Sequence, residues 1–301
     1  MEGLSRRQKQ REKRRRFVAR ILVFLGLMLI GLLYWLGGIL YSNSELSAKP
    51  LDGLYKPAAD YDYTLVPLAE IADTRCLELV NLDHPVAGYP EERSLQPLGR
   101  YLSAESEEVF LRPAALDALV GMYRDLSTAG LSFTVSSGYR GYQEQEQLYL
   151  SGEANLVMPP NYSEHHTGLA VDIPLNDFSG VRQLKGVTVN PGQWLHQNAW
   201  RYGLIVRYPA AKSHLTGIDY EPWHFRYLGL PHSWYIYQSG LCFEEYLQYL
   251  SQSGGYRVTL EGTTYIVRYQ MPIEGMIELP QGLDFSVSGD NQGGYIVTIR
   301  E

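Results

Sequence analysis

Positions 21–41 form an uncharged, strongly apolar run of 21 residues, ILVFLGLMLIGLLYWLGGILY, which restricts how the chain can be arranged. At about 1.5 Å per residue, a helix of this length crosses a hydrocarbon layer of about 30 Å. Residues 1–20 hold nine Lys or Arg against two Glu, and such basic flanks favour the cytoplasmic side. The sequence therefore predicts a basic cytoplasmic head (1–20), a single-pass transmembrane helix (21–41) in the cell membrane and an extracellular remainder.

A cleaved signal peptide is the alternative interpretation of the same run. The run exceeds the usual apolar core of about 7–15 residues in such peptides. Only Leu46-Ser47-Ala48 weakly resembles a cleavage site after it. An uncleaved anchor is therefore favoured.

The rest of the chain has the composition of an ordinary folded protein. Of the 301 residues, 45% are hydrophobic and 20% are charged, which excludes a wholly disordered chain. Residues 21–301 carry 17 Lys or Arg against 31 Asp or Glu, so this acidic body repels phosphate and no nucleic-acid partner is expected. Cys76 and Cys242 would lie outside the cell, but the sequence does not distinguish a disulfide from two buried thiols.

The extracellular remainder divides into three parts by residue pattern. Residues 42–75 are polar and rich in Pro and Tyr, which predicts a stalk and lead-in. Residues 76–253 alternate strand-like and helix-like segments and are expected to form the main domain. Residues 254–301 predict a small all-β appendage without an assigned role, because β-type runs alternate with glycine-containing turns. These runs are YRVTLEG, TTYIVRY, GMIELP and YIVTIR.

The main domain is predicted to be α+β. Its clearest helix is 112–130, where Pro113 suits the first turn and apolar residues recur with helical spacing. Further helices are expected at 142–150 and 192–202, and strands at 77–81, 131–137, 169–174, 204–208 and 222–228. The fold class is therefore a mixed or antiparallel sheet with helices packed mainly on one side, followed by the appendage.

Three polar clusters carry residues that suit catalysis. They are Ser137-Gly138-Tyr139-Arg140-Gly141-Tyr142 with Gln145 after it, the segment 163–172 (SEHHTGLAVD), and Glu221-Pro222-Trp223-His224. Along the strand 169–174, apolar residues alternate, so Asp172 lies on the face opposite to them. Two histidines and this carboxylate would leave a fourth tetrahedral position for water, as catalytic zinc sites do.

The residues alone leave two points open in this interpretation. His165 and His166 are neighbours that point in opposite directions on an extended chain, so only one of them is expected to be a ligand. Glu221 is a candidate base three residues before His224, and on an ideal strand these two side chains face opposite ways. A bend near Pro222 would be needed to bring both to one site. The other histidines are expected to be ordinary polar residues: His84, His196, His214 and His232.

Together the clusters resemble a known family. The spacing Ser-x-His-x-x-Gly-x-Ala-x-Asp, then Glu-x-Trp-His, after an upstream Ser-Gly-Tyr-Arg, is similar to the VanY-type zinc D-alanyl-D-alanine carboxypeptidases. These enzymes are related to the VanX dipeptidases and to some phage endolysin peptidases. The resemblance covers about residues 77–250, and LELVNLDHP at 77–85 is similar to the family's opening strand. Residues 254–301 lie outside it.

The resemblance implies a function and a role for each motif residue. It implies that Zn²⁺ is bound by His165, Asp172 and His224, that Glu221 is the catalytic acid and base, and that Arg140 holds the substrate or stabilises developing charge. Gln145 and Ser163 would line the pocket or order the ligands. The implied substrate is a peptidoglycan stem peptide that ends in D-Ala-D-Ala and loses its last D-Ala. The alternatives are an endopeptidase or a D,D-dipeptidase with the same zinc site, or a non-catalytic wall-binding module.

Overall fold

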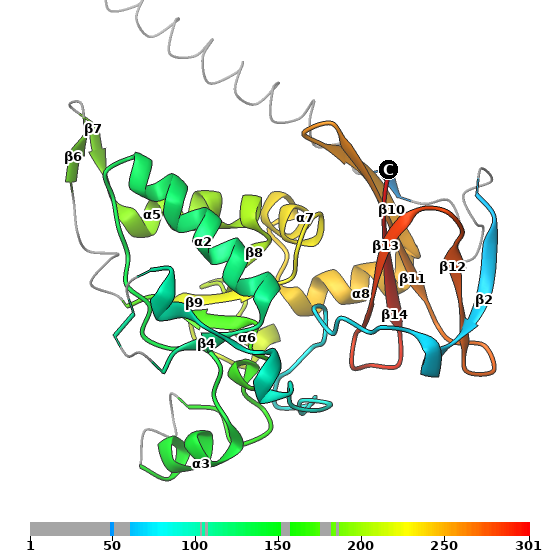
Figure 1. The fold of residues 1–301 in the computed structure, drawn as a ribbon, viewed down its shortest axis with the longest axis horizontal. Coiled ribbons are helices and arrows are strands. Elements are labelled where there is room, and N and C mark those ends of the chain that lie inside the picture. Colours follow the sequence, from blue (N-terminus) through cyan, green and yellow to red (C-terminus); the bar gives the residue numbers. More distant parts are fainter. Residues whose placement is uncertain are drawn as a thin grey trace, which may run out of the picture. The chain divides into compact units, whose positions relative to one another are not determined.

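A computed structural model gives the fold of the chain. It describes residues 49–50, 61–102, 104–105, 108–151, 157–174, 182–184 and 187–301. The predicted cytoplasmic head (1–20) and transmembrane helix (21–41) lie outside these ranges. Within the described ranges, no helix combines the length and the apolar character needed to cross a membrane. The chain is an α+β protein, as predicted, with several small sheets and helices (Figure 1).

A three-stranded antiparallel sheet forms the centre of the main domain. Its strand order is β5 (Ala170–Asp172), β9 (Glu221–Tyr227) and β8 (Leu204–Tyr208). One face buries Val171 and Phe225 in the core that also contains residues of α2 (Pro113–Thr128) and α5 (Pro191–Asn198). Because side chains alternate along a strand, the residues next to these two point to the opposite face. That face carries the polar residues Asp172 and His224.

The helices follow from local sequence signals. In α2, Pro113 occupies the first turn, where its missing N–H is not needed. Leu116, Leu119 and Leu126 share its buried face. A short helix, α3 (Tyr142–Leu150), begins after Gly141 as predicted. The predicted helix 192–202 is α5 followed by the 3-10 turn η5 (Ala199–Tyr202), which ends at Gly203 with a positive φ of 83°.

The other elements of the described chain are short or lie near the junction with the C-terminal sheet. They are β2 (Tyr63–Pro67), η1 (Leu68–Glu70), η2 (Glu92–Ser94), β3 (Gln96–Pro97), η3 (Leu98–Arg100), β4 (Phe110–Leu111), η4 (Glu164–Thr167), β6 (Arg182–Leu184), β7 (Val187–Val189), α6 (Ser213–Thr216), α7 (His232–Ser239) and α8 (Phe243–Ser253). Cys76 and Cys242 are both free thiols.

Two predicted strands of the main domain are wrong. Residues 77–80 are buried, but the segment 77–81 has no strand partner in the main domain within the described residues: Leu79 N–H donates to Asp290 O in a loop of the C-terminal sheet at 3.1 Å, and Asn81 N–H donates to the nearby His84 O at 3.0 Å. Residues 131–137 form no continuous strand within the described residues; their bridges there are isolated ones, from Val135 to Ala104 and from Ser137 to Asp172. In both segments the apolar residues pack into the core, so a strand-like pattern appears without a continuous ladder of hydrogen bonds.

The C-terminal residues form a sheet, as their pattern predicted. The strand order is β1 (Lys49–Pro50), β10 (Gly255–Leu260), β11 (Thr263–Gln270), β14 (Tyr295–Arg300) and β13 (Asp284–Gly289), all antiparallel. Strand β13 was not predicted. Strand β12 (Met276–Pro280) pairs instead with β2, which belongs to the predicted stalk and lead-in (42–75). Figure 1 shows these strands beside α8.

The C-terminal sheet shares a hydrophobic core with the main domain. Tyr256 and Val267 of the sheet pack in one cluster with Leu77, Trp234 and Phe243. The chain leaves α8 and enters β10 at Gly254. Residues on both sides of this point, Leu250 and Tyr256, belong to the same hydrophobic cluster. Both parts belong to one compact unit, Ala48–Glu301.

Candidate metal centre

His165 is held by a short 3-10 turn. Ser163 caps the turn η4, with its Oγ accepting a hydrogen bond from the backbone N–H of His165 at 3.3 Å. The turn ends at Gly168, whose φ of 67° favours glycine. The ring is fixed from behind, because Nδ1 lies 2.6 Å from the carbonyl oxygen of Gly138. A proton on Nδ1 leaves Nε2 free to bind a metal, and Nε2 lies 3.1 Å from Asp172 Oδ2.

Asp172 and His224 lie directly opposite each other on paired strands. Their Cα atoms are register partners in the β5–β9 ladder, which places both side chains on the same face. Asp172 Oδ1 lies 3.0 Å from His224 Nδ1. The predicted ligands His165, Asp172 and His224 therefore come together, and the structure places one donor atom from each within 4.8 Å of the others.

The donor set fits a zinc ion. Asp172 Oδ1 is buried and makes no hydrogen bond within the described part of the chain. Two imidazoles and one carboxylate are donors that zinc accepts, and three protein ligands leave the open position of a catalytic site. The zinc cofactor expected from the sequence thus has a site of suitable chemistry in the described residues.

The two histidines differ in their electrostatic surroundings. Burial lowers the pKa of His165, and with the nearby Arg140 cation it outweighs the attraction of Asp172. Burial would also lower the pKa of His224, but its contacts with Asp172 and Glu164 prevail and raise the pKa to about 9. The pKa of Asp172 lies far below its usual range, because His165 and His224 outweigh the effect of burial. Asp172 is therefore an ionised carboxylate, which is the form that binds metals.

Glu221 reaches the same site because strand β9 is irregular. Val206 pairs with Phe225, but Tyr208 pairs with Glu221, so β9 holds two extra residues in this stretch. The bend that the sequence required near Pro222 is this change of register. Glu221 Oε2 lies 3.8 Å from His224 Nδ1. Burial raises the pKa of Glu221, mainly because the charged form loses hydration.

A cavity of about 280 Å³ lies in front of these residues. Arg140, Ser163 and Glu221 line it, together with the three predicted ligands. Arg140 is fixed by two hydrogen bonds: Nη1 donates to Gln145 Oε1 at 2.8 Å and Nη2 donates to Ser137 Oγ at 2.9 Å. Gln145 is fully buried and is not among the residues that line the cavity, so it supports Arg140 from behind.

Other polar residues near the centre are placed differently from the predicted site residues. His166 is not part of the ligand group: its Nδ1 lies 2.7 Å from the carbonyl oxygen of Arg140, and its Nε2 accepts from Asn161 N–H at 3.1 Å. Sequence reasoning missed Glu164, which is buried between Arg207 and the metal centre. Burial would raise its pKa, but the charges of Arg207 and Arg226 outweigh this and hold the pKa far below its usual range. The available signal was its position beside His165 in the motif.

Comparisons with known proteins agree with this site. Residues 108–230 match the family model described as VanY, D-alanyl-D-alanine carboxypeptidase. A D-alanyl-D-alanine carboxypeptidase of Enterococcus faecium is 40% identical over 180 residues, covering 59% of this chain and 57% of that protein. VanXYC of Enterococcus gallinarum, a bifunctional D-Ala-D-Ala dipeptidase and D-Ala-D-Ala carboxypeptidase, is 32% identical over 199 residues, covering 59% of this chain and 96% of that protein.

A solved structure extends the likeness. The vancomycin-resistance D,D-dipeptidase VanXYg, in complex with a D-Ala-D-Ala phosphinate analogue, has a TM-score of 0.66 and 26% identity, covering 80% of this chain and 99% of that one. Residues 76–253 are 178 of the 301 residues, so this likeness reaches beyond the predicted main domain. The chain spans only 57% of the E. faecium relative. All the predicted site residues fall within 108–230, and the chain belongs to the VanY family.

Proposed function

We propose that this chain is a membrane-anchored zinc metallopeptidase that removes the terminal D-Ala from peptidoglycan stem peptides ending in D-Ala-D-Ala. The observation that carries the proposal is the convergence of His165, Asp172 and His224 within 4.8 Å at one cavity. The same cavity holds Glu221 and Arg140, which supply a base and a positive charge. Membership of the VanY family supports this substrate.

The three converging residues would hold the metal through His165 Nε2, an Asp172 carboxylate oxygen and His224 Nδ1. When bound there, zinc would polarise the scissile carbonyl and make an attacking water easier to deprotonate. Each imidazole is already oriented by a contact on its other nitrogen, His165 by Gly138 O and His224 by Glu164. The chain therefore presents the ligand atoms in fixed positions.

Glu221 would move the proton in the reaction. Its carboxylate lies on the cavity wall next to His224, where it can take a proton from the attacking water. Burial raises its pKa, which makes it a stronger base than an exposed carboxylate. The same group would then deliver the proton to the departing amine of D-Ala.

Arg140 would bind the substrate or offset the charge that develops on the carbonyl oxygen. Its hydrogen bonds to Gln145 and Ser137 fix the guanidinium at the cavity wall. A fixed cation in a cavity stabilises negative charge without rearranging during the reaction. The rest of the chain is acidic, so this local positive charge is needed to attract a substrate that ends in a carboxylate.

The anchor and the location rest on the sequence pattern of residues 1–41. The basic head and the apolar run would hold the catalytic part outside the cell membrane, next to newly made wall. We expect the chain to stay in the membrane fraction after an alkaline carbonate wash. We also expect externally added protease to degrade it in cells whose wall has been removed. Release by carbonate, or protection from protease, would contradict the proposed anchor and orientation.

The activity is tested with the purified full-length chain in a mild detergent. The chain is loaded with zinc and mixed with a stem pentapeptide that ends in D-Ala-D-Ala, and mass spectrometry identifies the products. We expect loss of one alanine, abolished by a chelator. An intact peptide in the presence of a zinc-loaded chain would contradict the proposed activity.

A D,D-dipeptidase is the second candidate, and one observation favours it. The likeness to VanXYg covers 80% of this chain, and that protein is a D,D-dipeptidase. The same zinc site would then hydrolyse free D-Ala-D-Ala. Supplying the dipeptide and the pentapeptide separately distinguishes the two activities, because a pure carboxypeptidase leaves the dipeptide intact.

A further inference from the structure

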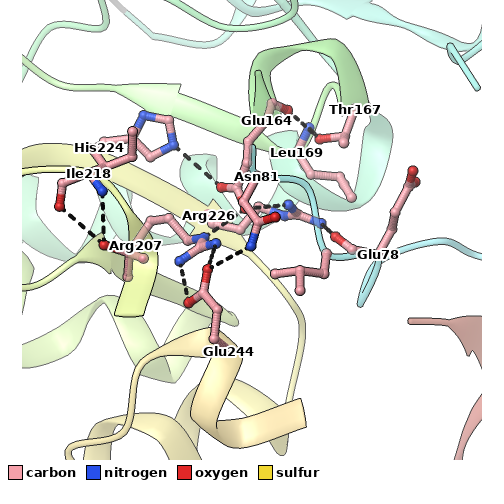
Figure 2. A network of polar contacts seen from close by, with 12 residues as sticks. Glu78, Asn81, Glu164, Thr167, Leu169, Arg207, Ile218, His224, Arg226 and Glu244 are labelled. Carbon is pink, nitrogen blue, oxygen red and sulfur yellow. Dashed lines mark hydrogen bonds and ion pairs between the residues drawn. The ribbon is translucent and has the colours of Figure 1, made fainter. Parts of the chain in front are cut away.

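Glu164 is a buried charge with an uneven set of partners. Its side chain is completely buried. One oxygen, Oε1, accepts hydrogen bonds from Arg207 Nε at 2.7 Å and from Arg226 Nη1 at 2.9 Å. Figure 2 shows this carboxylate between the two guanidinium groups and the ring of His224. Such charges are stable inside a protein only when they are well paired.

The other oxygen of Glu164 faces the metal centre. Oε2 lies 3.5 Å from His224 Nε2. Both atoms are buried, and neither has a hydrogen-bond partner within the described part of the chain. Each is therefore the available partner of the other. Both arginines donate to Oε1, so the pairing with them does not account for the position of Oε2.

Arg207 and Arg226 each make further hydrogen bonds to other residues, and these fix the carboxylate of Glu164 in place. Arg207 donates to Glu244 Oε2 and Oε1 at 2.9 and 2.6 Å. Arg226 Nη2 donates to the carbonyl oxygen of Cys76 at 3.1 Å and to that of Glu78 at 2.9 Å. Figure 2 shows Glu78 and Glu244 beside the two arginines. Two cations and two carboxylates balance in charge in this network, and the hydrogen bonds from the two held arginines keep Glu164 beside His224.

We propose that Glu164 is a positioning residue for the metal ligand His224. By accepting a hydrogen bond from the Nε2–H of His224, it fixes the tautomer in which Nδ1 is free, and it orients that nitrogen toward Asp172 and the ion. The two histidines are supported differently, since His165 uses the neutral carbonyl of Gly138. A carboxylate partner also makes an imidazole a better donor to a metal. The inference rests on the proposed function only in taking zinc as the metal.

The first test is Glu164→Gln in the full-length chain, with Glu244→Gln as its matched control. Both variants remove one negative charge from Arg207, but only Glu164 contacts His224. Zinc affinity is measured by competition with a chelating dye, and circular dichroism checks the fold. We expect Glu164→Gln to bind zinc about 10–100-fold more weakly. Glu244→Gln should stay within about threefold of the parent, because the contact with His224 remains. A folded Glu164→Gln variant with parental affinity, or an equal loss in both variants, would overturn the proposal.

A second measurement needs no variant that might misfold. In the zinc-loaded parent, labelled with ¹⁵N-histidine, long-range proton–nitrogen NMR spectra report which ring nitrogen of His224 carries the proton. The proposal requires the proton on Nε2 and the metal on Nδ1, and the opposite tautomer would overturn it. If zinc binds as expected but the pentapeptide stays intact, the proposed activity fails while this inference stands. A chain that binds no zinc overturns both.

Discussion

The metal centre and the junction between α7, α8 and the C-terminal sheet both bury a histidine, yet the two histidines have opposite properties. His224 lies between Asp172 and Glu164, and these carboxylates raise its pKa to about 9. His232 is equally buried, but its ring nitrogens lie beside the hydroxyl groups of Tyr246 and Thr298, and burial lowers its pKa to about 3. The surroundings rather than the residue type decide whether a buried histidine is suited to binding a cation or to joining two parts of a core.

The largest effect should come from removing a ligand. His224→Ala is expected to lose bound zinc and to lower kcat/KM by more than about 10³-fold, because the two remaining ligands, His165 and Asp172, are too few to hold the ion. Metal analysis and D-Ala release measure the two effects. His232→Gln is the control from the junction. Its zinc content and its kcat/KM should both stay within about threefold of the parent. Full zinc content in His224→Ala would contradict the assignment of His224, in contrast to His232, as a metal ligand.

Removing the proposed base should separate binding from chemistry. Glu221→Ala is expected to lower kcat by about 10²–10⁴-fold while one zinc per chain is retained, since Glu221 is a proton carrier and not a ligand. Steady-state kinetics with metal analysis on the same sample measures this. A kcat within about tenfold of the parent value would contradict the role of Glu221 as the base.

Replacing Arg140 should lower kcat/KM more than replacing Gln145, which supports it. Arg140→Ala is expected to lower kcat/KM by about 10²-fold, because the cavity loses its fixed positive charge. Gln145→Ala should have a smaller effect, about tenfold, since Arg140 keeps its hydrogen bond to Ser137. Kinetics on a peptide series with and without a free terminal carboxylate measures the loss. Equal effects of both substitutions would show that Gln145 does more than hold Arg140.

The smallest effect concerns stability at the junction. His232 stays neutral when folded down to about pH 3, whereas in the unfolded chain it binds a proton below about pH 6.5. The unfolded state then binds more protons, so stability falls as the pH decreases between these values, by about 1.4 kcal/mol per unit. From pH 6.5 to pH 5 the parent should lose about 2 kcal/mol through this residue. Denaturant unfolding of His232→Gln at fixed zinc should show this part of the loss removed, and an identical pH slope in both chains would contradict it.

Much of the site could be predicted because its residues follow local rules. The alternation along 169–174 places Asp172 opposite the core face, and the helix signal at Pro113 lies where α2 begins. The resemblance to the VanY family implied that His165, Asp172 and His224 share one site, although the register that pairs Asp172 with His224 joins residues 52 positions apart in sequence.

The parts that were missed depend on contacts between distant residues. Glu164 has a partner in β8, Arg207, and another in β9, Arg226, and no local pattern reveals such a network. Residues 77–81 look like a strand because Leu77, Leu79 and Val80 are apolar, but Leu79 N–H bonds to a loop of the C-terminal sheet instead of a neighbouring strand. Strand β13 lies at the end of the strand order, next to β14, and has exposed positions, including Phe285, so its pattern is weak.

The most direct test of this account is the zinc dependence of D-Ala release from the stem pentapeptide. The full-length chain is stripped of metal with a chelator, dialysed, and assayed before and after adding increasing amounts of zinc. The account predicts no release from the stripped chain, and release that rises to a plateau at one zinc per chain. Release that is unaffected by removing the metal would contradict it.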